Sequence, residues 1–444
     1  MKKNKILFVG GGSNAWTPNI IKDLMLTDSL QGAEIVLYDI NKKASDFNKI
    51  FLDKLAGQLK LNFKITSTDN PAIAFKDAKY VLIAISTGGL KAMAYDISIP
   101  EEYGIYHTVG DTSGPGGWAR SIRNYDAFVD LANKINKYCP EAFILNYTNP
   151  MIFLTDILQQ LCKCPVIGLC HGLFENIEAL KEIYKFKDES EIHLKYAGLN
   201  HFFWITEAKY KTIDIIDDFT KRLKTKTIPD ILPISKVDPM GFKSGKAVAD
   251  ELFRMTGVIP YFGGRHICEY FSWFITNKQN MRKYNLKRTS IDDRVWLFKM
   301  RARALQKAVK GIIPEYYFKR SRETAADIIN AHFTGKQFID VGNVKNIGQI
   351  TNLPLGTVVE TACMIDKNGV TPLSFGALPG IVAGFCQPYA NVFNMTVNAC
   401  MEKNKDMALQ ALRLDPVCAH LTWTQVKQMG EKLLNAHKKY ISIF

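Results

Sequence analysis

The sequence predicts an α/β fold: a doubly wound parallel sheet of the Rossmann type in residues 1–198, followed by a mixed α+β domain in residues 199–444. Short apolar runs alternate with segments of helix length over the first part of the chain, which is typical of a parallel sheet covered by helices. A glycine-rich segment directly follows the first run. Beyond about residue 199 the pattern changes to strand-like runs and long helical stretches, which indicates the second domain.

Five apolar runs are predicted to form the strands of the first domain. They are residues 5–9, 34–38, 80–85, 142–146 and 166–169. In an open α/β sheet, ligands bind beyond the carboxyl ends of the strands, so the residues that follow each run are the candidates for a site. The second domain is expected to hold a strand at 202–204, helices at 294–310 and 324–333, strands and turns at 354–372, and a closing helix at 423–439.

The composition fits a soluble globular protein, with 47% hydrophobic and 23% charged residues. No apolar stretch approaches the roughly 18 residues that a membrane span needs, so no membrane association is expected. Nine cysteines at irregular spacings indicate a reducing compartment, and we expect a cytoplasmic location. The net charge of +14 comes from lysines scattered over the chain, without a basic stripe interleaved with aromatics. We therefore expect no nucleic-acid partner, although the charge can help attract an acidic substrate.

The segment Gly10–Ala15 (GGGSNA) matches the dinucleotide-binding pattern G-x-G-x-x-A, and a helical pattern begins near Pro18. Gly10 permits a tight turn, and Gly12 lets the backbone approach a pyrophosphate at the helix N-terminus. The second strand ends in Asp39, whose carboxylate can bind a ribose diol and would repel a 2′-phosphate, which favours NAD over NADP. The predicted cofactor site consists of Gly10, Gly12, Ser13, Asn14, Ala15, Asp39, Ser86 and Thr87.

Three further strand ends carry unusual residues: 146–150 (NYTNP), 168–172 (GLCHG) and 198–202 (GLNHF). In the predicted sheet all three lie at the edge that carries the glycine turn. A thiolate at Cys170 and an imidazole at His201 would form a two-point metal site with open positions for substrate oxygens. A single cysteine is more often a small buried hydrophobic residue, so the spacing alone leaves the metal site open.

Together with 110–117 (GDTSGPGG), these segments resemble glycoside hydrolase family 4, and the resemblance continues through 265–266, 325–329 and 352–354. The resemblance implies a fold similar to that of lactate and malate dehydrogenases. It also implies a hydrolysis that requires NAD+ and a divalent metal, commonly Mn2+, instead of the paired carboxylates of other glycosidases. The expected steps are oxidation at sugar C3, deprotonation at C2, elimination of the leaving group from C1, addition of water and re-reduction at C3.

The resemblance also assigns roles to individual residues. Cys170 and His201 match the metal ligands of the family, and Asn149 matches an asparagine that contacts the substrate. His171 stands where phospho-sugar members carry an aspartate, and it is expected to act as an acid at the leaving group or to contact the substrate. Tyr261 is the candidate base at C2, because Gly264 occupies the place of an aspartate found in relatives.

The expected substrate is an unphosphorylated α-glycoside. Met93 stands where phospho-sugar members carry a phosphate-binding arginine. Residues 104–112 and the pair Arg265–His266 resemble the α-galacturonidase and α-glucuronidase branch, so an α-galacturonide ranks first, an α-glucuronide second and a neutral α-galactoside third. A sugar carboxylate needs a cation. Candidates are Arg265, Arg120, Arg123 and Lys91, and His266 is a further substrate contact.

Two functions of other classes remain open at this point. A 2-hydroxyacid dehydrogenase would share the cofactor domain, but it would produce NADH in stoichiometric amounts without a metal. A nucleotide-sensing or nucleic-acid-binding protein that has lost catalysis is the other alternative, since the aspartate expected at position 264 is missing. The family resemblance further implies a homodimer or a homotetramer.

Overall fold

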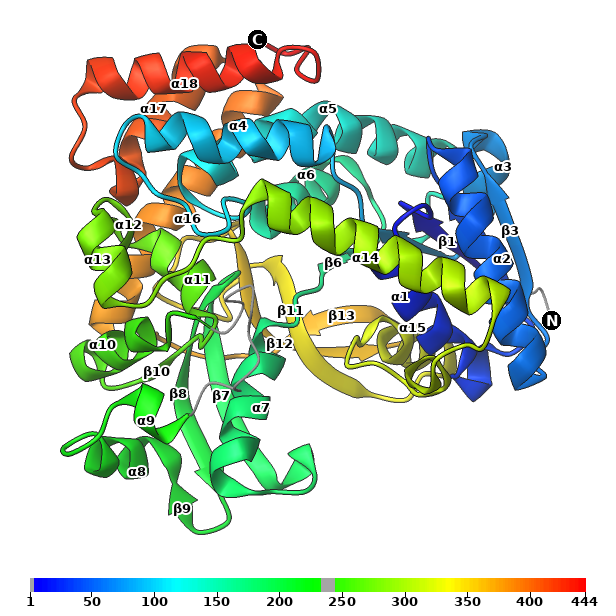
Figure 1. The fold of residues 1–444 in the computed structure, drawn as a ribbon, viewed down its shortest axis with the longest axis horizontal. Coiled ribbons are helices and arrows are strands. Elements are labelled where there is room, and N and C mark those ends of the chain that lie inside the picture. The colour runs from blue at the N-terminus through cyan, green and yellow to red at the C-terminus, as the bar shows by residue number, and fades with distance from the viewer. Residues whose placement is uncertain (1–3, 233–243) are drawn as a thin grey trace.

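The computed structural model describes residues 4–232 and 244–444 (Figure 1). One mixed sheet runs through this part of the chain, in the order β10-β8-β7-β12-β11-β6-β5-β4-β1-β2-β3, with β13 paired to β12 and β9 paired to β8. The strands are β1 Lys5–Val9, β2 Glu34–Tyr38, β3 Lys64–Thr68, β4 Tyr80–Ile83, β5 Phe143–Asn146, β6 Val166–Gly168, β7 Ile192–Leu199, β8 Phe202–Tyr210, β9 Ile213–Asp214, β10 Ile259–Pro260, β11 Phe338–Lys345, β12 Val358–Asp366 and β13 Gly369–Pro372.

Helices cover the sheet on both faces. The longer ones are α1 Trp16–Met25, α2 Lys42–Leu59, α4 Gly89–Glu101, α5 Gly114–Tyr138, α6 Met151–Leu161, α7 Gly172–Tyr184, α8 Ile215–Arg222, α10 Lys246–Thr256, α14 Ile291–Lys310, α15 Ala325–Thr334, α16 Gly380–Met401, α17 Lys405–Leu414 and α18 Trp423–His437. Shorter ones are α3 Pro71–Phe75, α9 Ile228–Ile231, α11 Gly264–Ile267, α12 Ser272–Ile275 and α13 Lys278–Lys283. No helix in 4–232 or 244–444 is long and apolar enough to cross a membrane.

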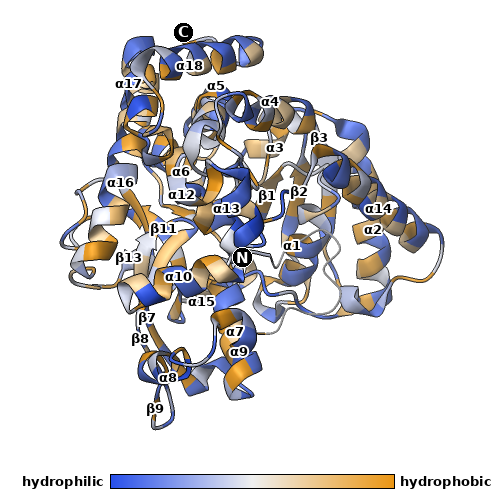
Figure 2. Ribbon diagram, turned by 60° about the vertical axis from the view of Figure 1, so that its left-hand side comes forward, coloured by the Kyte–Doolittle hydropathy of each residue, from blue (hydrophilic) through white to orange (hydrophobic). Residues whose placement is uncertain are grey.

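The first six strands confirm the predicted Rossmann sheet. Their spatial order is 3-2-1-4-5-6 and every neighbouring pair is parallel. Alternate residues of β1 face opposite layers: Leu7 and Val9 belong to one buried apolar cluster, and Ile6 and Phe8 belong to the other. Figure 2 shows the amphipathic outer layer, in which helices such as α14 alternate between hydrophilic and hydrophobic residues.

The sequence analysis missed β3, the edge strand. Its sequence, KITST, has only one large apolar residue, Ile65, so it lacks the apolar run that marks the inner strands. An edge strand contacts one neighbour and tolerates polar residues on its open side, which explains the weak pattern. The fourth strand also ends at Ile83, two residues earlier than expected.

The second half of the sheet is antiparallel. Strand β11 pairs with β6, β12 pairs with β11, and the hairpin β7–β8 is attached through β12 (Figure 1). The predicted boundary at residue 198 falls within β7, which begins at Ile192, and the division into two domains there stays a prediction. The segment 198–202, predicted as a strand end at the edge that carries the glycine turn, is the turn of the antiparallel hairpin β7–β8.

A single row of paired residues crosses both halves of the sheet. In order across the sheet it consists of Thr68, Tyr38, Val9, Ile83, Asn146, Gly168, Asn343, Glu360, Gly198 and Phe203. The glycine turn, Asp39, the 84–87 segment, Asn149, Cys170 and His201 all follow a member of this row within four residues along the chain. Apart from Thr68 at the edge of the sheet, the polar residues of the row lie toward its middle, where Asn146, Asn343 and Glu360 are fully buried.

Candidate active site

The glycine turn between β1 and α1 has the geometry expected for close approach of a ligand. Gly10 has φ +101°, and a Cβ there would lie 2.2 Å from the carbonyl oxygen of Ala84, so no larger residue fits. Asn48 of α2 donates to the carbonyl oxygen of Gly11 at 2.8 Å and holds the turn from behind. Ser13 Oγ accepts from the N–H of Trp16 at 3.1 Å, at the first turn of α1.

Asp39 lies directly under this turn. Its carboxylate accepts hydrogen bonds from the N–H groups of Gly12 and Asn41, both at 2.8 Å. Of the other predicted cofactor residues, Thr87 donates its N–H to Asn124 Oδ1 at 3.1 Å, and Ser86 is exposed. The structure thus brings Gly12 and Asp39 together, and it places the 84–87 segment against Gly10 through Ala84.

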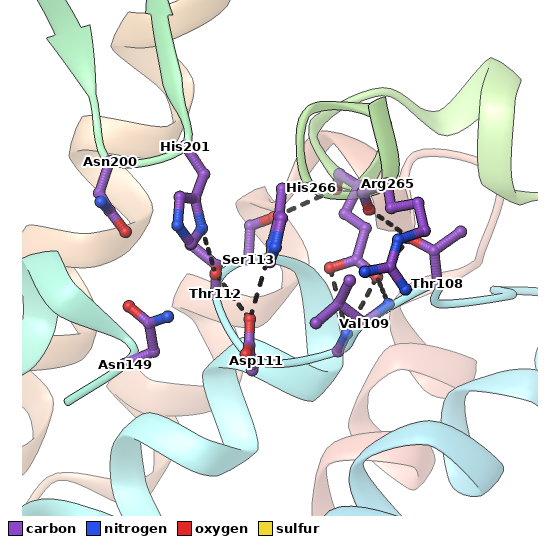
Figure 3. Close-up of polar contacts among 12 residues, drawn as sticks. Thr108, Val109, Asp111, Thr112, Ser113, Asn149, Asn200, His201, Arg265 and His266 are labelled. Carbon is purple, nitrogen blue, oxygen red and sulfur yellow. Dashed lines mark hydrogen bonds and ion pairs between the residues drawn. The ribbon is translucent and has the colours of Figure 1, made fainter. Parts of the chain in front are cut away.

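His201 lies in the β7–β8 turn with φ +57°, in the left-handed region that few residues other than glycine adopt. Its Nδ1 is 3.0 Å from Thr112 Oγ1, and the Thr112 hydroxyl donates to Asp111 Oδ1 at 2.9 Å (Figure 3). Since a hydroxyl has one hydrogen, Thr112 must accept from His201 Nδ1–H. This fixes the ring tautomer and leaves the lone pair of Nε2 available to a metal.

Asp111 and His266 complete a cluster with His201 that the sequence analysis did not expect. One ligand atom from each of the three residues lies within 4.8 Å of the others. Burial lowers the pKa of His266 to about 4. Burial raises the pKa of Asp111, but the neighbouring His266 and Arg120 outweigh this effect and hold it at about 2. At neutral pH the cluster therefore combines one carboxylate with a neutral imidazole at His266.

A buried glutamate positions the loop that carries Asp111. Glu269 accepts from the N–H groups of Val109 and Gly110 at 2.7 and 3.0 Å and from the Thr108 hydroxyl at 3.1 Å. The sequence gives no local sign of this contact, because Glu269 is about 160 residues from its partners along the chain.

Cys170 follows β6 and is half-buried. Its Sγ accepts from the N–H of Gly172 at 3.4 Å. Burial raises the pKa of the thiol, whereas a hydrogen bond with the Asn200 side chain acts in the opposite direction. The three-residue cluster found within the described chain does not include Cys170. The predicted Cys170–His201 metal pair therefore stays a prediction, supported by the contact with Asn200, the neighbour of His201.

Two amide groups face each other beside the His201 ring (Figure 3). They belong to Asn149, whose backbone oxygen accepts from Arg120 Nε at 3.0 Å, and to Asn200. The Oδ1 atoms of both side chains are buried without a hydrogen-bond partner within the described residues. A thiol, an imidazole Nε2 and unpartnered amide oxygens are donor types that bind a divalent metal and sugar hydroxyls, so the residues present fit such a group.

Tyr261 stacks on His201, with ring centroids 5.8 Å apart and an interplanar angle of 19°. Its hydroxyl donates to Glu175 Oε2 at 3.0 Å, and burial followed by the charge of Glu175 raises its pKa well above the usual value. A Cβ at Gly263 would lie 2.1 Å from Tyr261 Cζ, so glycine there makes room for the phenol. A Cβ at Gly264 would lie 2.2 Å from the Gly245 carbonyl oxygen, which excludes an aspartate from this backbone.

His171 lies at the start of α7, with about half of its side chain exposed. Its Nδ1 is 3.7 Å from Glu323 Oε1, and its ring centroid is 6.5 Å from that of Trp16, the first residue of α1. Its predicted role at the leaving group stays a prediction. The ring faces the helix that follows the glycine turn, and Tyr261 packs against His201 instead.

The candidate carboxylate-binding cations differ in availability. Arg123 is fully buried and its Nη1 and Nη2 already bind Asp96, at 2.5 and 2.8 Å, so it is not available to a substrate. Arg265 is buried and donates to Thr289. Lys91 is exposed on α4, and Met93 is buried. Arg120 is buried beside Asn149, and no ion pair involves it in the part of the chain that the structure describes.

Known proteins of one family match nearly the whole chain. The model of "Family 4 glycosyl hydrolase" matches residues 5–186, and that of its C-terminal domain matches residues 196–418. An alpha-galacturonidase of Thermoanaerobacter italicus is 32% identical, covering 98% of this chain and 97% of the relative. An alpha-galactosidase of Bacillus subtilis is 31% identical, covering 98% and 99%.

Solved structures of related proteins also align with nearly the whole chain. A putative glucosidase, lplD, from Bacillus subtilis aligns with a TM-score of 0.87 at 28% identity, over 97% of this chain and all of that one. The 6-phospho-beta glucosidase of Thermotoga maritima, solved with manganese, NAD+ and glucose-6-phosphate, aligns with a TM-score of 0.80 at 26% identity, over 99% of each chain. Malate dehydrogenase of Plasmodium falciparum, at 12% identity and a TM-score of 0.50, shares the fold, with 93% of this chain and 99% of that chain covered. The chain therefore belongs to family 4 of the glycosyl hydrolases.

Proposed function

We propose that this glycoside hydrolase cleaves unphosphorylated α-galacturonides and uses NAD and a divalent metal, Mn2+, to do so. The proposal of an acidic sugar is supported by two arginines beside Asp111. Arg120 and Arg294 both act to lower the pKa of Asp111. Arg294 Nε is buried without a hydrogen-bond partner, and neither arginine forms an ion pair with a described residue. Two guanidinium groups near one carboxylate leave one positive charge unbalanced, and this charge can bind the carboxylate of a substrate.

The proposed cofactor and metal contacts follow from the geometry of the two strand ends. When bound, NAD supplies reversible oxidation at sugar C3, and the metal acts as a Lewis acid toward the C2 and C3 oxygens. The residues Gly10, Gly12, Ser13, Asn14 and Ala15 would hold the pyrophosphate, Asp39 the ribose, and Ser86 and Thr87 the rest of the cofactor. Cys170 and His201 would hold the metal, and Asn149 would orient the sugar.

Tyr261 is the proposed base at C2. Its hydroxyl points at Glu175 Oε2, which gives the phenolic proton an acceptor before Tyr261 takes up the proton from the sugar. His171, next to Cys170 and half-exposed, would protonate the leaving oxygen from the open side of the site. The side of the site that faces the sugar would be lined by Arg265, His266 and Arg120.

A substrate panel tests this proposal. Purified protein would be incubated with NAD+, Mn2+, a thiol reductant and the aryl α-galacturonide, α-glucuronide and α-galactoside. We expect aglycon release that is fastest with the galacturonide, without accumulation of NADH, and with exchange of solvent deuterium into sugar C2. Stoichiometric NADH without aglycon release would instead identify a dehydrogenase, and nucleotide binding without turnover would indicate a sensor.

A neutral α-galactoside, ranked third from the sequence, moves ahead of the α-glucuronide as the second candidate substrate, because one relative of nearly the same identity is an alpha-galactosidase. The ratio of kcat/KM for the two sugars decides between them. We further propose that the enzyme acts in the cytoplasm as a homodimer or homotetramer. All nine cysteines carry free thiols, which fits a reducing compartment. Light scattering coupled to size exclusion measures the oligomeric state.

A further inference from the structure

Glu360 is a fully buried carboxyl group at the centre of the sheet. It lies on β12, between Asn343 on β11 and Gly198 on β7 in the row that crosses both halves. No ion pair involves it within 4–232 and 244–444. Its hydrogen-bond donors are two neutral amides, Asn200 Nδ2 at 2.7 Å and Asn343 Nδ2 at 3.1 Å, and both bind Oε2. Burying a carboxyl group without a cation is costly, so its presence in a sheet core indicates a role beyond packing.

The contact with Glu360 determines which way the Asn200 amide points. Glu360 Oε2 accepts from the NH2 group of Asn200, so the Asn200 Oδ1 points away from Glu360. The backbone of Asn200 is held as well, because its carbonyl oxygen accepts from the Tyr270 hydroxyl at 2.7 Å. The Oδ1 atom is buried and has no partner within the described residues. In Figure 3 the amide lies beside the His201 ring and opposite Asn149.

The Asn200 oxygen faces the space between Asn149 and the ring of His201, one of the proposed metal ligands (Figure 3). The neighbouring residue, His201, has its Nδ1 occupied by Thr112 and its Nε2 lone pair available. The Asn200 NH2 group also donates toward the Cys170 thiol, which places this amide beside the second proposed ligand. A thiolate and an imidazole alone form a soft set that suits Zn2+ well, whereas an amide oxygen shifts the preference toward Mn2+.

We propose that Glu360 is a positioning residue for the metal site: through the Asn200 amide it directs Asn200 Oδ1 to the metal held by Cys170 and His201, as an oxygen ligand. This inference rests on the proposed use of a divalent metal. It links Glu360 on β12 to a metal site whose proposed ligands come from both halves of the sheet, Cys170 after β6 and His201 in the β7–β8 turn. It also gives a physical reason for the polar middle of the row.

The test measures metal affinity directly, without turnover. Mn2+ would be titrated into the full-length protein and free Mn2+ followed by electron paramagnetic resonance, in the absence of sugar. Glu360→Met removes the acceptor and fills its volume, and we expect the Kd for Mn2+ to rise about tenfold or more. Glu360→Gln keeps an acceptor oxygen at the same place and is expected to bind Mn2+ within about threefold of the native protein. Zn2+ affinity should change less than Mn2+ affinity in Glu360→Met.

Two further variants control for loss of structure. Asp340→Leu removes another buried carboxyl group of the same sheet, and we expect native Mn2+ affinity. Asn200→Ser should lose as much Mn2+ affinity as Glu360→Met, and the double variant should lose no more than either, because both act through one contact. NAD+ affinity reports folding in every case. Native Mn2+ affinity in folded Glu360→Met overturns the inference alone, whereas a native protein that binds no Mn2+ overturns the proposed function as well.

Discussion

Tyr261 shows how single residues of the site depend on one another. Its ring occupies the space that a side chain at position 263 would need, and its hydroxyl is bonded to Glu175. The sequence identified Tyr261 as the candidate base because an aspartate was missing at 264. The structure adds the reason, since the Gly245 carbonyl oxygen fills the place of any Cβ at 264. Glycine is therefore needed at 263 to make room for Tyr261, and at 264 to make room for the Gly245 carbonyl oxygen.

Replacing Tyr261 by phenylalanine should therefore remove the base and leave the packing intact. We expect kcat for aglycon release to fall by about a hundredfold or more, the usual contribution of general base catalysis. Exchange of solvent deuterium into sugar C2 should fall in parallel, and NAD+ affinity should stay unchanged. A Tyr261→Phe enzyme that still exchanges the C2 proton at the native rate would assign the base elsewhere.

Residue positions that depend on distant partners could not be predicted. Asp111 and Thr112 lie in a motif that the sequence analysis recognised, but their contact with His201 spans 89 residues. Glu269 and Glu360 had no local sign of importance, since each is an ordinary acidic residue until the fold buries it. By contrast, the glycine turn, Asp39, Cys170 and His201 could be named as candidate site residues from the sequence, because each lies in a short motif at a predicted strand end.

The pH dependence of the free energy of unfolding tests the burial of the Asp340 carboxyl group. Burial raises its pKa to about 7, so the folded protein binds a proton there more strongly than the unfolded chain does. Its stabilising contribution is full below the unfolded pKa of about 4 and is lost as the pH rises through about 7. We expect Asp340→Asn to flatten this decline and to be more stable than the native protein at pH 8, by an amount on the order of a few kcal/mol. Urea unfolding at pH 5 and pH 8 measures the free energy of unfolding of both proteins. An equal change between the two pH values in both proteins would contradict the raised pKa of Asp340.

At the scale of elements, β1 was predicted with the bounds that the structure has, and α1 was predicted to begin near Pro18, two residues after its first residue, because the apolar run and the glycines are local signals. The hairpin β7–β8 was predicted as a site segment for the wrong reason. Its strands are antiparallel to their neighbours, so His201 comes to the site from a turn and not from the end of a parallel strand. Sequence periodicity does not show strand direction, which only the pairing through β12 determines.

The glycine turn can be tested with matched variants of two glycines. A Cβ at Gly12 would lie 2.8 Å from Ala44 Cβ and 2.9 Å from Asp39 Oδ2, so Gly12→Ala would displace the turn or the Asp39 carboxylate and should weaken NAD+ binding by at least about tenfold. Gly57 lies inside α2 with no atom within 4 Å of an added Cβ. Gly57→Ala should keep native NAD+ affinity and stabilise the protein by about 0.5–1 kcal/mol. Calorimetric titration with NAD+ compares the two, and equal affinities would remove the turn from the cofactor site.

At the scale of the whole molecule, the net charge of +14 should influence how substrates arrive. A positive surface attracts an anionic sugar over distances that salt screens. We expect kcat/KM for an aryl α-galacturonide to fall several-fold between about 20 and 500 mM salt, and that for the neutral α-galactoside to stay nearly constant. The same salt dependence for both sugars would show that the charge has no part in substrate capture.

The continuous row of paired residues has a consequence for how the enzyme works. The turn proposed for the oxidant and the ligands proposed for the metal are joined by backbone hydrogen bonds from strand to strand, from β1 through β4, β5, β6, β11 and β12 to β7. Their separation is therefore established when the chain folds. Because both sites belong to one sheet, we expect the proposed oxidant and metal to reach one sugar ring without the closure of two separate lobes.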